Sequence, residues 1–301
     1  MLRGRIVGGC VSRRPPGGRG AAGRGSPRPR GGARSAGGKR QSRRDLDGRQ
    51  VEGRQAVREL LIAGKRRTKE ILLDKDAGHS EILDDIVELA AEARVPVREV
   101  SRSRIAAECR TDAPQGVIAR ADPLREVDIE VLCSGANRPF LVAFDGVTDP
   151  GNLGAALRSA ECAGATGAIL PRHRAVHITP VAAKAAAGAI EYLPMALAGG
   201  LPAALSRLAD SGVWILGLDE TGTTSLFDLS IAGEAVCLVL GSEGRGLSRL
   251  VRQRCDEVVA IPLEGNISSL NVAAAGTLAC FEVTRRRGGP AVPGLRVRKG
   301  C

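Results

Sequence analysis

The stretch PFLVAFDGVTDPGNLGAALRSAECAGATGAILP, residues 139–171, decides the fold. It opens with the apolar run 140–144, which is typical of a strand buried on both faces. A turn with Asp, Gly and Pro follows, and then the segment NLGAALRSAECAGA, which we predict to be a helix. The short run GAILP predicts a second strand. Alternating buried strands and helices predict a mostly parallel sheet with helices on both faces.

The same alternation continues to the C-terminus. We predict further strands in 212–219, 235–244 and 256–263, a helix of small residues in 179–189 and a long terminal helix in 268–286. In such sheets ligands bind beyond the carboxyl ends of the strands. The loops that follow residues 145, 240 and 262 are therefore the expected functional site.

Upstream of this unit the pattern predicts a smaller α/β domain. Residues 51–121 alternate helix and strand, and 122–138 read as a connector with one short helix. We therefore divide the chain into a disordered Arg/Gly-rich tail (1–48), a small domain (49–121), a linker (122–138), a large domain (139–287) and a basic C-terminal tail (288–301).

The positive charge of the chain is confined to its two ends. Of 44 Lys and Arg, 13 lie in 1–44 and six in 285–301, and neither segment contains an acid. The remaining 25 bases face all 33 Asp and Glu, so an acidic globule carries two basic tails. Tails of this kind bind nucleic acid without sequence preference or remain solvated.

Several classes of protein are excluded by composition. No apolar run approaches the roughly 20 residues that span a bilayer, so we expect no membrane association. The eight cysteines show no Cys-x-x-Cys spacing and there are only three histidines, so we expect reduced thiols, a cytoplasmic location and no metal.

Three loops at strand ends carry the candidate chemistry. The first, DPGNLGAALR, contains Asn152 and Arg158. The second, LGSEGRGL, has glycines but matches neither the Walker motif nor the dinucleotide fingerprint, which argues against a nucleotide-dependent dehydrogenase. Its Glu243 would repel phosphate and favours a cationic or hydroxyl-bearing ligand. The third, IPLEGNISSLNVAAA, places Ser269 and Asn271 before the terminal helix.

Taken together, these three motifs resemble those of the SpoU/TrmH family of RNA 2′-O-ribose methyltransferases, in the SPOUT superfamily. The resemblance covers roughly 139–284 and includes KAAAGAIEYLP at 184–194. The upstream stretch VEGRQAVRELL…QGVIARA resembles the small RNA-binding domain of the RlmB-like branch, which methylates guanosine in 23S rRNA. The tail 1–48 lies outside the resemblance.

The resemblance implies a fold, a cofactor and a set of site residues. The large domain would be a SPOUT α/β domain with a trefoil knot, and the protein would be a homodimer with its active site near the interface. S-adenosylmethionine would be bound by Leu240, Gly241, Ile261, Pro262 and Leu270. The catalytic and ribose-binding set would be Asn152, Arg158, Glu243, Ser269 and Asn271.

The resemblance leaves open which side chain activates the 2′-hydroxyl. An arginine with a pKa near 13 is deprotonated about once in 10⁶ molecules at pH 7, a cost of roughly 8 kcal/mol. We therefore favour Arg158 as a cation toward phosphate and alkoxide. Glu243 is the competing candidate for the base.

The sequence is compatible with more than one RNA substrate. We expect RNA to contact basic residues of the small domain, namely Arg54, Arg58, Lys65, Arg66, Arg67 and Lys69. A guanosine of 23S rRNA is the leading target. A tRNA ribose, an rRNA adenosine whose methylation gives antibiotic resistance, and a non-catalytic ribosome-assembly role remain alternatives.

Overall fold

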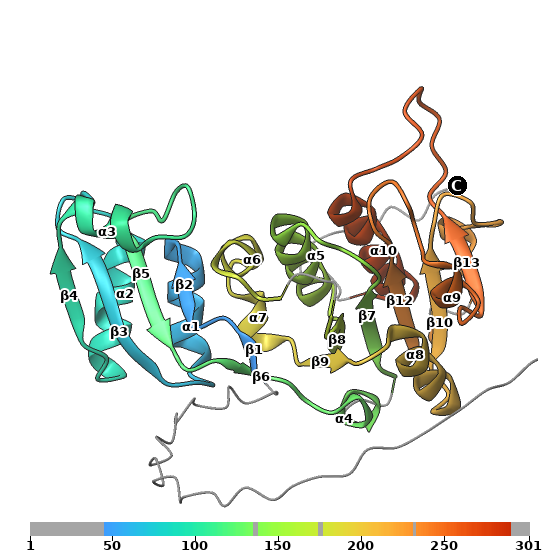
Figure 1. The fold of residues 1–301 in the computed structure, drawn as a ribbon, viewed down its shortest axis with the longest axis horizontal. Coiled ribbons are helices and arrows are strands. Elements are labelled where there is room, and N and C mark those ends of the chain that lie inside the picture. Colours follow the sequence, from blue (N-terminus) through green and yellow to red (C-terminus); the bar gives the residue numbers. More distant parts are fainter. Residues whose placement is uncertain (1–44, 135–137, 174–176, 231–232, 290–301) are drawn as a thin grey trace, which may run out of the picture. The chain divides into compact units, whose positions relative to one another are not determined.

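The computed structural model describes residues 45–134, 138–173, 177–230 and 233–289. Its largest element is a seven-stranded sheet in the order β11-β13-β10-β12-β7-β8-β9, with every neighbouring pair parallel (Figure 1). The strands are β7 (Phe140–Phe144), β8 (Gly167–Pro171), β9 (Met195–Ala198), β10 (Trp214–Leu218), β11 (Thr224–Ser225), β12 (Val236–Leu240) and β13 (Glu257–Ala260).

Helices cover both faces of this sheet, as the apolar strand runs predicted. One face packs against α5 (Pro150–Cys162), α6 (Pro180–Ala186), α7 (Ala189–Tyr192) and α10 (Val272–Arg286). The other packs against α4 (Ile129–Ser134), α8 (Leu201–Asp210) and α9 (Arg249–Arg252). A 3₁₀ turn, η1, spans Leu226–Asp228.

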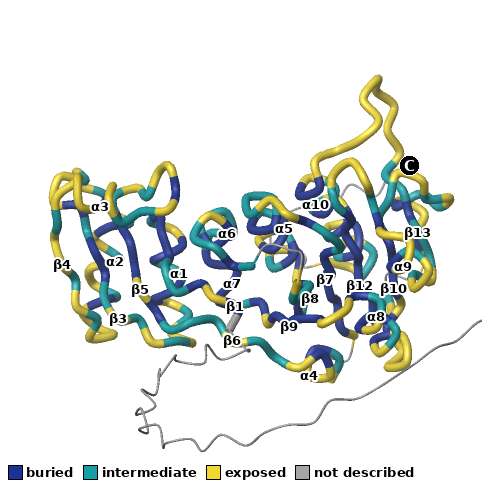
Figure 2. The backbone as a smooth tube through the Cα atoms, viewed as in Figure 1, coloured by how far each residue is buried: buried dark blue, intermediate teal, exposed yellow. Residues whose placement is uncertain are grey.

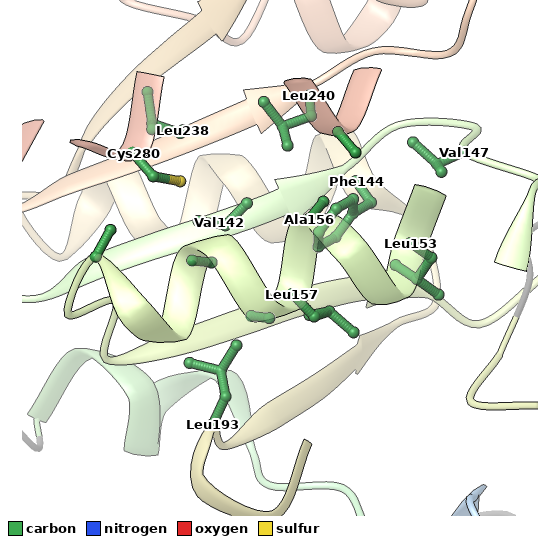
Figure 3. Close-up of a cluster of buried hydrophobic side chains, with 14 of the residues drawn as sticks. Val142, Phe144, Val147, Leu153, Ala156, Leu157, Leu193, Leu238, Leu240 and Cys280 are labelled. Atoms are coloured by element: carbon green, nitrogen blue, oxygen red, sulfur yellow. The ribbon is translucent and has the colours of Figure 1, made fainter. Parts of the chain in front are cut away.

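Central strand β7 shows why the sheet needs apolar residues at every position. Phe140, Val142 and Phe144 enter the cluster on the α5 face, and Leu141 and Ala143 enter the cluster on the α8 face. Figure 3 shows side chains of β7, β12 and α5 meeting in the first of these clusters. The central strands are accordingly buried along their whole length (Figure 2).

The helix after β7 begins earlier than the sequence analysis placed it. Pro150 is its first residue, and the Asp149 side chain accepts a hydrogen bond from the Asn152 backbone N–H. Asn152 and Gly154 therefore lie within α5, two and four residues after its first residue. Gly154 is needed for close packing, since a Cβ there would lie 2.3 Å from the Ala182 carbonyl oxygen of α6.

The small domain contains a four-stranded sheet in the order β2-β5-β3-β4. Its strands are β2 (Gln50–Glu52), β3 (Thr68–Asp74), β4 (Val97–Val100) and β5 (Val117–Ala121). The helices α1 (Arg54–Ala63) and α2 (Glu81–Glu92) cover one face, and α3 (Arg102–Glu108) covers the other. β3 pairs antiparallel with β5 and parallel with β4, so this sheet is mixed.

Ordered structure also begins earlier than predicted. The disordered tail was expected to run to residue 48, but β1 (Asp45–Asp47) pairs antiparallel with β6 (Leu124–Arg125), and Leu46 is fully buried. The burial of Leu46 and the hydrogen bond from the Gly48 N–H to the Ile178 carbonyl hold the segment against the rest of the chain. The rest of the expected N-terminal tail and residues 290–301 lie outside the described residues. Among the described helices, none combines the length and apolarity that crossing a bilayer requires.

Candidate active site

Four loops meet at the carboxyl edge of the large sheet, after β7, β10, β12 and β13. The loops after β10, β12 and β13 enclose a cavity of about 310 Å³, here called cavity A. Cavity A is lined by Leu218, Asp219, Glu220, Leu240, Gly241, Ser242, Glu243, Gly244, Gly246, Ile261, Leu263, Ser268, Ser269, Leu270, Val272 and Ala275. It thus contains Ser269 and four of the five predicted cofactor residues, whereas Pro262 is exposed and is not in the lining.

The LGSEGRGL motif forms a closed turn at the rim of cavity A. The Ser242 N–H donates to the Gly246 carbonyl at 3.1 Å, and the Gly246 N–H donates to the Ser242 carbonyl at 3.0 Å. A Cβ on Gly241 would lie 2.4 Å from the carbonyl carbon of Gly246, and Gly246 itself has φ of 62°. The glycines therefore let the chain fold back on itself and leave Glu243 exposed at the tip of the turn.

Asp219, which the sequence analysis did not single out, anchors this turn from the end of β10. Its Oδ2 accepts a hydrogen bond from the Leu247 N–H at 2.9 Å, and Arg252 lies 3.2 Å from its Oδ1. Burial opposes ionisation, but hydrogen bonds from Thr221 and Leu247 outweigh it and hold the pKa of Asp219 below its usual value. In the sequence, Asp219 is the last residue of the strand-like segment GVWILGLD. This position at a strand end could have identified it as a candidate.

Asn152, Glu243 and Asn271 form one hydrogen-bonded cluster, although they come from three separate segments: the first turn of α5, the turn after β12 and the N-cap of α10. The Asn271 Nδ2 donates to Glu243 Oε1 and to Asn152 Oδ1, both at 2.8 Å. The Asn152 Nδ2 donates to the same Glu243 Oε1 at 2.9 Å. Two amide groups therefore hold one oxygen of the Glu243 carboxylate.

The cap of α10 fixes which way the Asn271 amide points. Its Oδ1 accepts hydrogen bonds from the backbone N–H groups of Ala273 at 2.9 Å and Ala274 at 3.3 Å. Backbone N–H groups only donate, so the amide oxygen must face the helix and the amide nitrogen must face Glu243. The first turn of α10 thereby orients the carboxylate.

A second hollow, cavity B, adjoins the first and has a volume of about 530 Å³. It is lined by Asp145, Gly146, Val147, Thr148, Asp149, Asn152, Ser242, Glu243, Arg245, Gly246, Ser248 and Val272. Ser242, Glu243, Gly246 and Val272 line both cavities. Glu243 can therefore contact a ligand bound in cavity B while a second ligand is bound next to it in cavity A.

Arg158 lies apart from this cluster. Because α5 starts at Pro150, Arg158 is two turns into the helix, where its side chain is exposed and lines neither cavity. Its guanidinium forms no hydrogen bond or ion pair with any residue that the structure describes. Of the five predicted catalytic residues, the structure brings three into one cluster, puts Ser269 in cavity A and leaves Arg158 outside.

The predicted RNA-binding residues divide into exposed cations and one buried one. Arg66 is the buried one: its side chain is 7% exposed and forms a bidentate ion pair with Glu191 of α7. It also donates to the backbone carbonyls of Gly48 and Asp122. Since all its bonds point inward, Arg66 holds the chain together and is unavailable to phosphate, contrary to the prediction.

The other five residues of this set keep some exposure. Arg58 pairs with Asp85, Lys69 pairs with Asp122, and Lys65 lies over the Tyr192 ring. Arg54 donates to the Gln115 carbonyl and to Ser80, and Arg67 is exposed. Within the described ranges, no cluster of three or more His, Cys, Asp or Glu has the arrangement of a metal site.

Comparison with known proteins matches both halves of the chain. Residues 139–281 match the SpoU rRNA Methylase family, and residues 50–127 match the domain described as RNA 2′-O ribose methyltransferase substrate binding. The chain is 35% identical over 240 residues to the 23S rRNA (guanosine-2′-O-)-methyltransferase RlmB of Escherichia coli K12, covering 79% of this chain and 98% of that protein. The chain belongs to the SpoU family.

Two further SpoU proteins are similar to this chain, one in sequence and one in structure. An RlmB protein from a Burkholderia species is 45% identical over 201 residues, which cover 66% of this chain and 81% of the relative. Among solved structures, the SpoU methyltransferase AviRb from Streptomyces viridochromogenes, in complex with AdoMet, superimposes with a TM-score of 0.67 at 26% identity. That match covers 80% of this chain and 91% of AviRb. The SpoU fold predicted from the three motifs is thus confirmed.

Proposed function

We propose that this protein transfers a methyl group from S-adenosylmethionine to the ribose 2′-oxygen of a guanosine in 23S rRNA. The observation that carries the proposal is the placement of Glu243, which two amides orient in the wall shared by cavities A and B. The RlmB relatives, named for methylation of a 23S rRNA guanosine, support the choice of target.

The residues of cavity A fit S-adenosylmethionine. Leu240, Ile261 and Leu270 supply apolar surface for an adenine ring, as expected for the predicted cofactor residues. Asp219 and Glu243 supply acceptors for hydroxyl and ammonium groups and complement a positive ligand. When bound, S-adenosylmethionine supplies an electrophilic methyl group on a sulfonium, which needs no metal.

In cavity B, Glu243 is the group that takes the proton of the 2′-hydroxyl. One of its oxygens accepts both amide hydrogen bonds, so the other oxygen remains available to the hydroxyl. Holding the carboxylate in one orientation places base and reacting oxygen together before the reaction, which lowers the entropic part of the barrier. Asn152 and Asn271 position the base. Ser269, which lies in cavity A, contacts the cofactor.

We propose that Arg158 acts across a homodimer. Its exposed guanidinium lies outside the cavities of its own chain, which suits a cation that binds the target phosphate and stabilises the alkoxide in a partner's site. α10 presents an exposed apolar stripe of Ala274, Leu278 and Phe281 at helical spacing, and this stripe is our candidate contact surface. Phe281→Glu is expected to yield inactive monomers on size-exclusion chromatography with light scattering.

Four further features belong to the same proposal. The small domain 49–121 binds the RNA substrate, and the loops around cavity A form the trefoil knot expected of the SPOUT superfamily. The enzyme works in the cytoplasm, where its thiols stay reduced; the six described cysteines are all unpaired. The basic N-terminal tail adds sequence-independent affinity for RNA.

The proposal is tested by mapping ribose methylation in rRNA and tRNA from cells that lack the gene. We expect one 23S rRNA guanosine to lose its methyl group, and to regain it when the wild-type gene, but not Glu243→Gln, is returned. Loss of a tRNA methyl group or of an rRNA adenosine methyl group would select one of the alternatives. A complete set of methyl groups would favour a non-catalytic role.

A further inference from the structure

A third hollow, cavity C, lies in the small domain, away from the catalytic cluster. It has a volume of about 380 Å³ and is lined by Arg54, Asp74, Ala77, Arg102, Ile105, Ala106, Cys109, Asp112, Pro114, Gln115 and Gly116. These residues come from the start of α1, the end of β3, the helix α3 and the loop 109–116 that leads into β5 (Figure 1).

The loop 109–116 is fixed from beneath by a buried carboxylate. Glu52 has no exposed surface, and it accepts hydrogen bonds from the Arg110 N–H at 2.7 Å, the Thr111 N–H at 3.1 Å and the Thr111 hydroxyl at 2.6 Å. A charge in such a position is retained only when hydrogen bonds satisfy it. Its role here is to hold one wall of cavity C in place.

The other end of the loop is fixed by Gln115. This residue has φ of 56°, which is unusual for a side chain with a Cβ, and it is followed by Gly116 at φ 77°. The Gln115 side chain accepts a hydrogen bond from the Arg54 N–H, and its backbone carbonyl accepts one from Arg54 Nε, both at 3.0 Å. Cavity C is therefore already shaped before any ligand arrives.

The lining of cavity C combines three kinds of surface. Ala106 and Pro114 provide an apolar wall, with Ile105 buried behind it. The Arg102 side chain is 76% exposed, and among the described residues only Asp74 accepts from it, at 3.4 Å. Asp74 lies in the wall of the cavity and is 95% buried; its Oδ1 accepts a hydrogen bond from the Asp76 N–H at 3.0 Å, and its Oδ2 faces Arg102.

This combination selects a class of ligand. The carboxylates of Asp74 and Asp112 disfavour a free phosphate, but the exposed Asp112 can accept a hydrogen bond from the exocyclic amino group of a nucleobase. The apolar wall suits a base that has left its stack, and the exposed Arg102 suits the phosphate of that nucleotide. A single unpaired nucleotide of RNA presents an apolar face, amino donors and one negative charge together.

We propose that cavity C binds one unstacked nucleotide of the substrate RNA, with its base against Ala106 and Pro114 and its phosphate on Arg102. This inference rests on the proposed function only in taking RNA as the substrate. It moves the expected RNA surface from the segment around residues 65–69 to the loop 109–116 and α3. The arginines of SRSR, residues 101–104, were the signal in the sequence.

The test uses the full chain and deproteinised 23S rRNA transcript as the probe, with two pairs of variants. Ala106→Phe fills cavity C, and Ala107→Phe is its control, since Ala107 is also exposed on α3 but does not line the cavity. Arg102→Ala removes the phosphate contact, and Arg98→Ala is its control, because Arg98 is 66% exposed in the same domain outside the cavity.

We expect Ala106→Phe and Arg102→Ala each to weaken rRNA binding by about 5- to 30-fold, as for losing one base or phosphate contact. Arg102→Ala is also expected to reduce the slope of log affinity against log salt by about 0.7 to 0.9. The KM for rRNA is expected to rise while kcat and the affinity for S-adenosylhomocysteine stay unchanged. Both controls are expected to bind like wild type.

Binding of both cavity variants within twofold of their controls would overturn the inference. So would a defect seen only with intact ribosomal subunits, because that result would mean that cavity C contacts a ribosomal protein. The outcome is separable from the proposed function. A wild-type protein that binds rRNA through cavity C without methylating it would refute the proposed function and leave this inference standing.

Discussion

Asn271 is expected to do two separable things, to cap α10 and to orient Glu243, and three variants distinguish them. Asn271→Ala removes both the cap oxygen and the amide donor. Losing a helix cap costs about 1 kcal/mol, which for a chain of this size lowers Tm by about 2–4 °C. The loss of a group that positions a general base is expected to reduce kcat by about 10²- to 10³-fold.

Asn271→Asp keeps the cap and changes the contacts with Glu243 and Asn152. A carboxylate is as good a cap as an amide and favours the helix N-terminus, so Tm is expected to stay within about 2 °C of wild type. The variant replaces a donor 2.8 Å from Glu243 Oε1 with a second negative charge. At 4 Å such a pair repels by about 1 kcal/mol in water and about 4 kcal/mol near a protein surface.

The two carboxyl groups of this variant therefore share a proton to higher pH than one alone. We expect the acidic limb of its kcat profile to move to higher pH, with part of the lost activity recovered above pH 8. Asn271→Ser, which keeps a cap oxygen without a new charge, is expected to lose activity with no such displacement. Thermal unfolding and single-turnover methylation between pH 6 and 9 measure both effects. Wild-type kcat in Asn271→Asp, with an unchanged profile, would refute the orienting role.

Three other outcomes follow from named contacts. Arg66→Ala leaves Glu191 buried without its partner and is expected to destabilise the protein by about 3–5 kcal/mol in urea unfolding. Arg67 is exposed, so Arg67→Ala is expected to have little effect on stability. Equal stability of the two variants would contradict the buried ion pair. Because the pKa of Asp219 is held below its usual value, its ionisation stabilises the folded state above about pH 4, and this contribution disappears as the pH falls. The stability gap between wild type and Asp219→Asn should therefore be full at pH 7 and close toward pH 3, and a gap independent of pH would show that the charge is irrelevant. Arg158→Lys is expected to reduce the rate by about 10- to 1,000-fold with no new pH dependence, and a log-linear rise from pH 7 to 10, absent from wild type, would favour Arg158 as the base.

Much of the fold could be predicted from local patterns. The apolar runs of β7 and β12 are buried at every position, and the middle of β10 is buried as well. Strands buried on both faces must pack against helices on both sides of the sheet. Several elements were missed. β9, β11 and the helices α8 and α9 were not predicted individually, and β1 was assigned to the disordered tail. A three-residue strand has too few positions to show a period.

The sequence by itself determined that loops after residues 145, 240 and 262 share one edge of a parallel sheet, because parallel strands all end on the same side. It also brought Asn152, Glu243 and Asn271 forward as candidates through their motifs. Only the tertiary structure decided which atoms meet. The orientation of the Asn271 amide depends on where α10 begins, and the burial of Arg66 depends on Glu191, 125 residues away. The sequence alone does not show whether a charged side chain is exposed to water or paired with another residue. That outcome depends on how segments distant in the chain pack against each other.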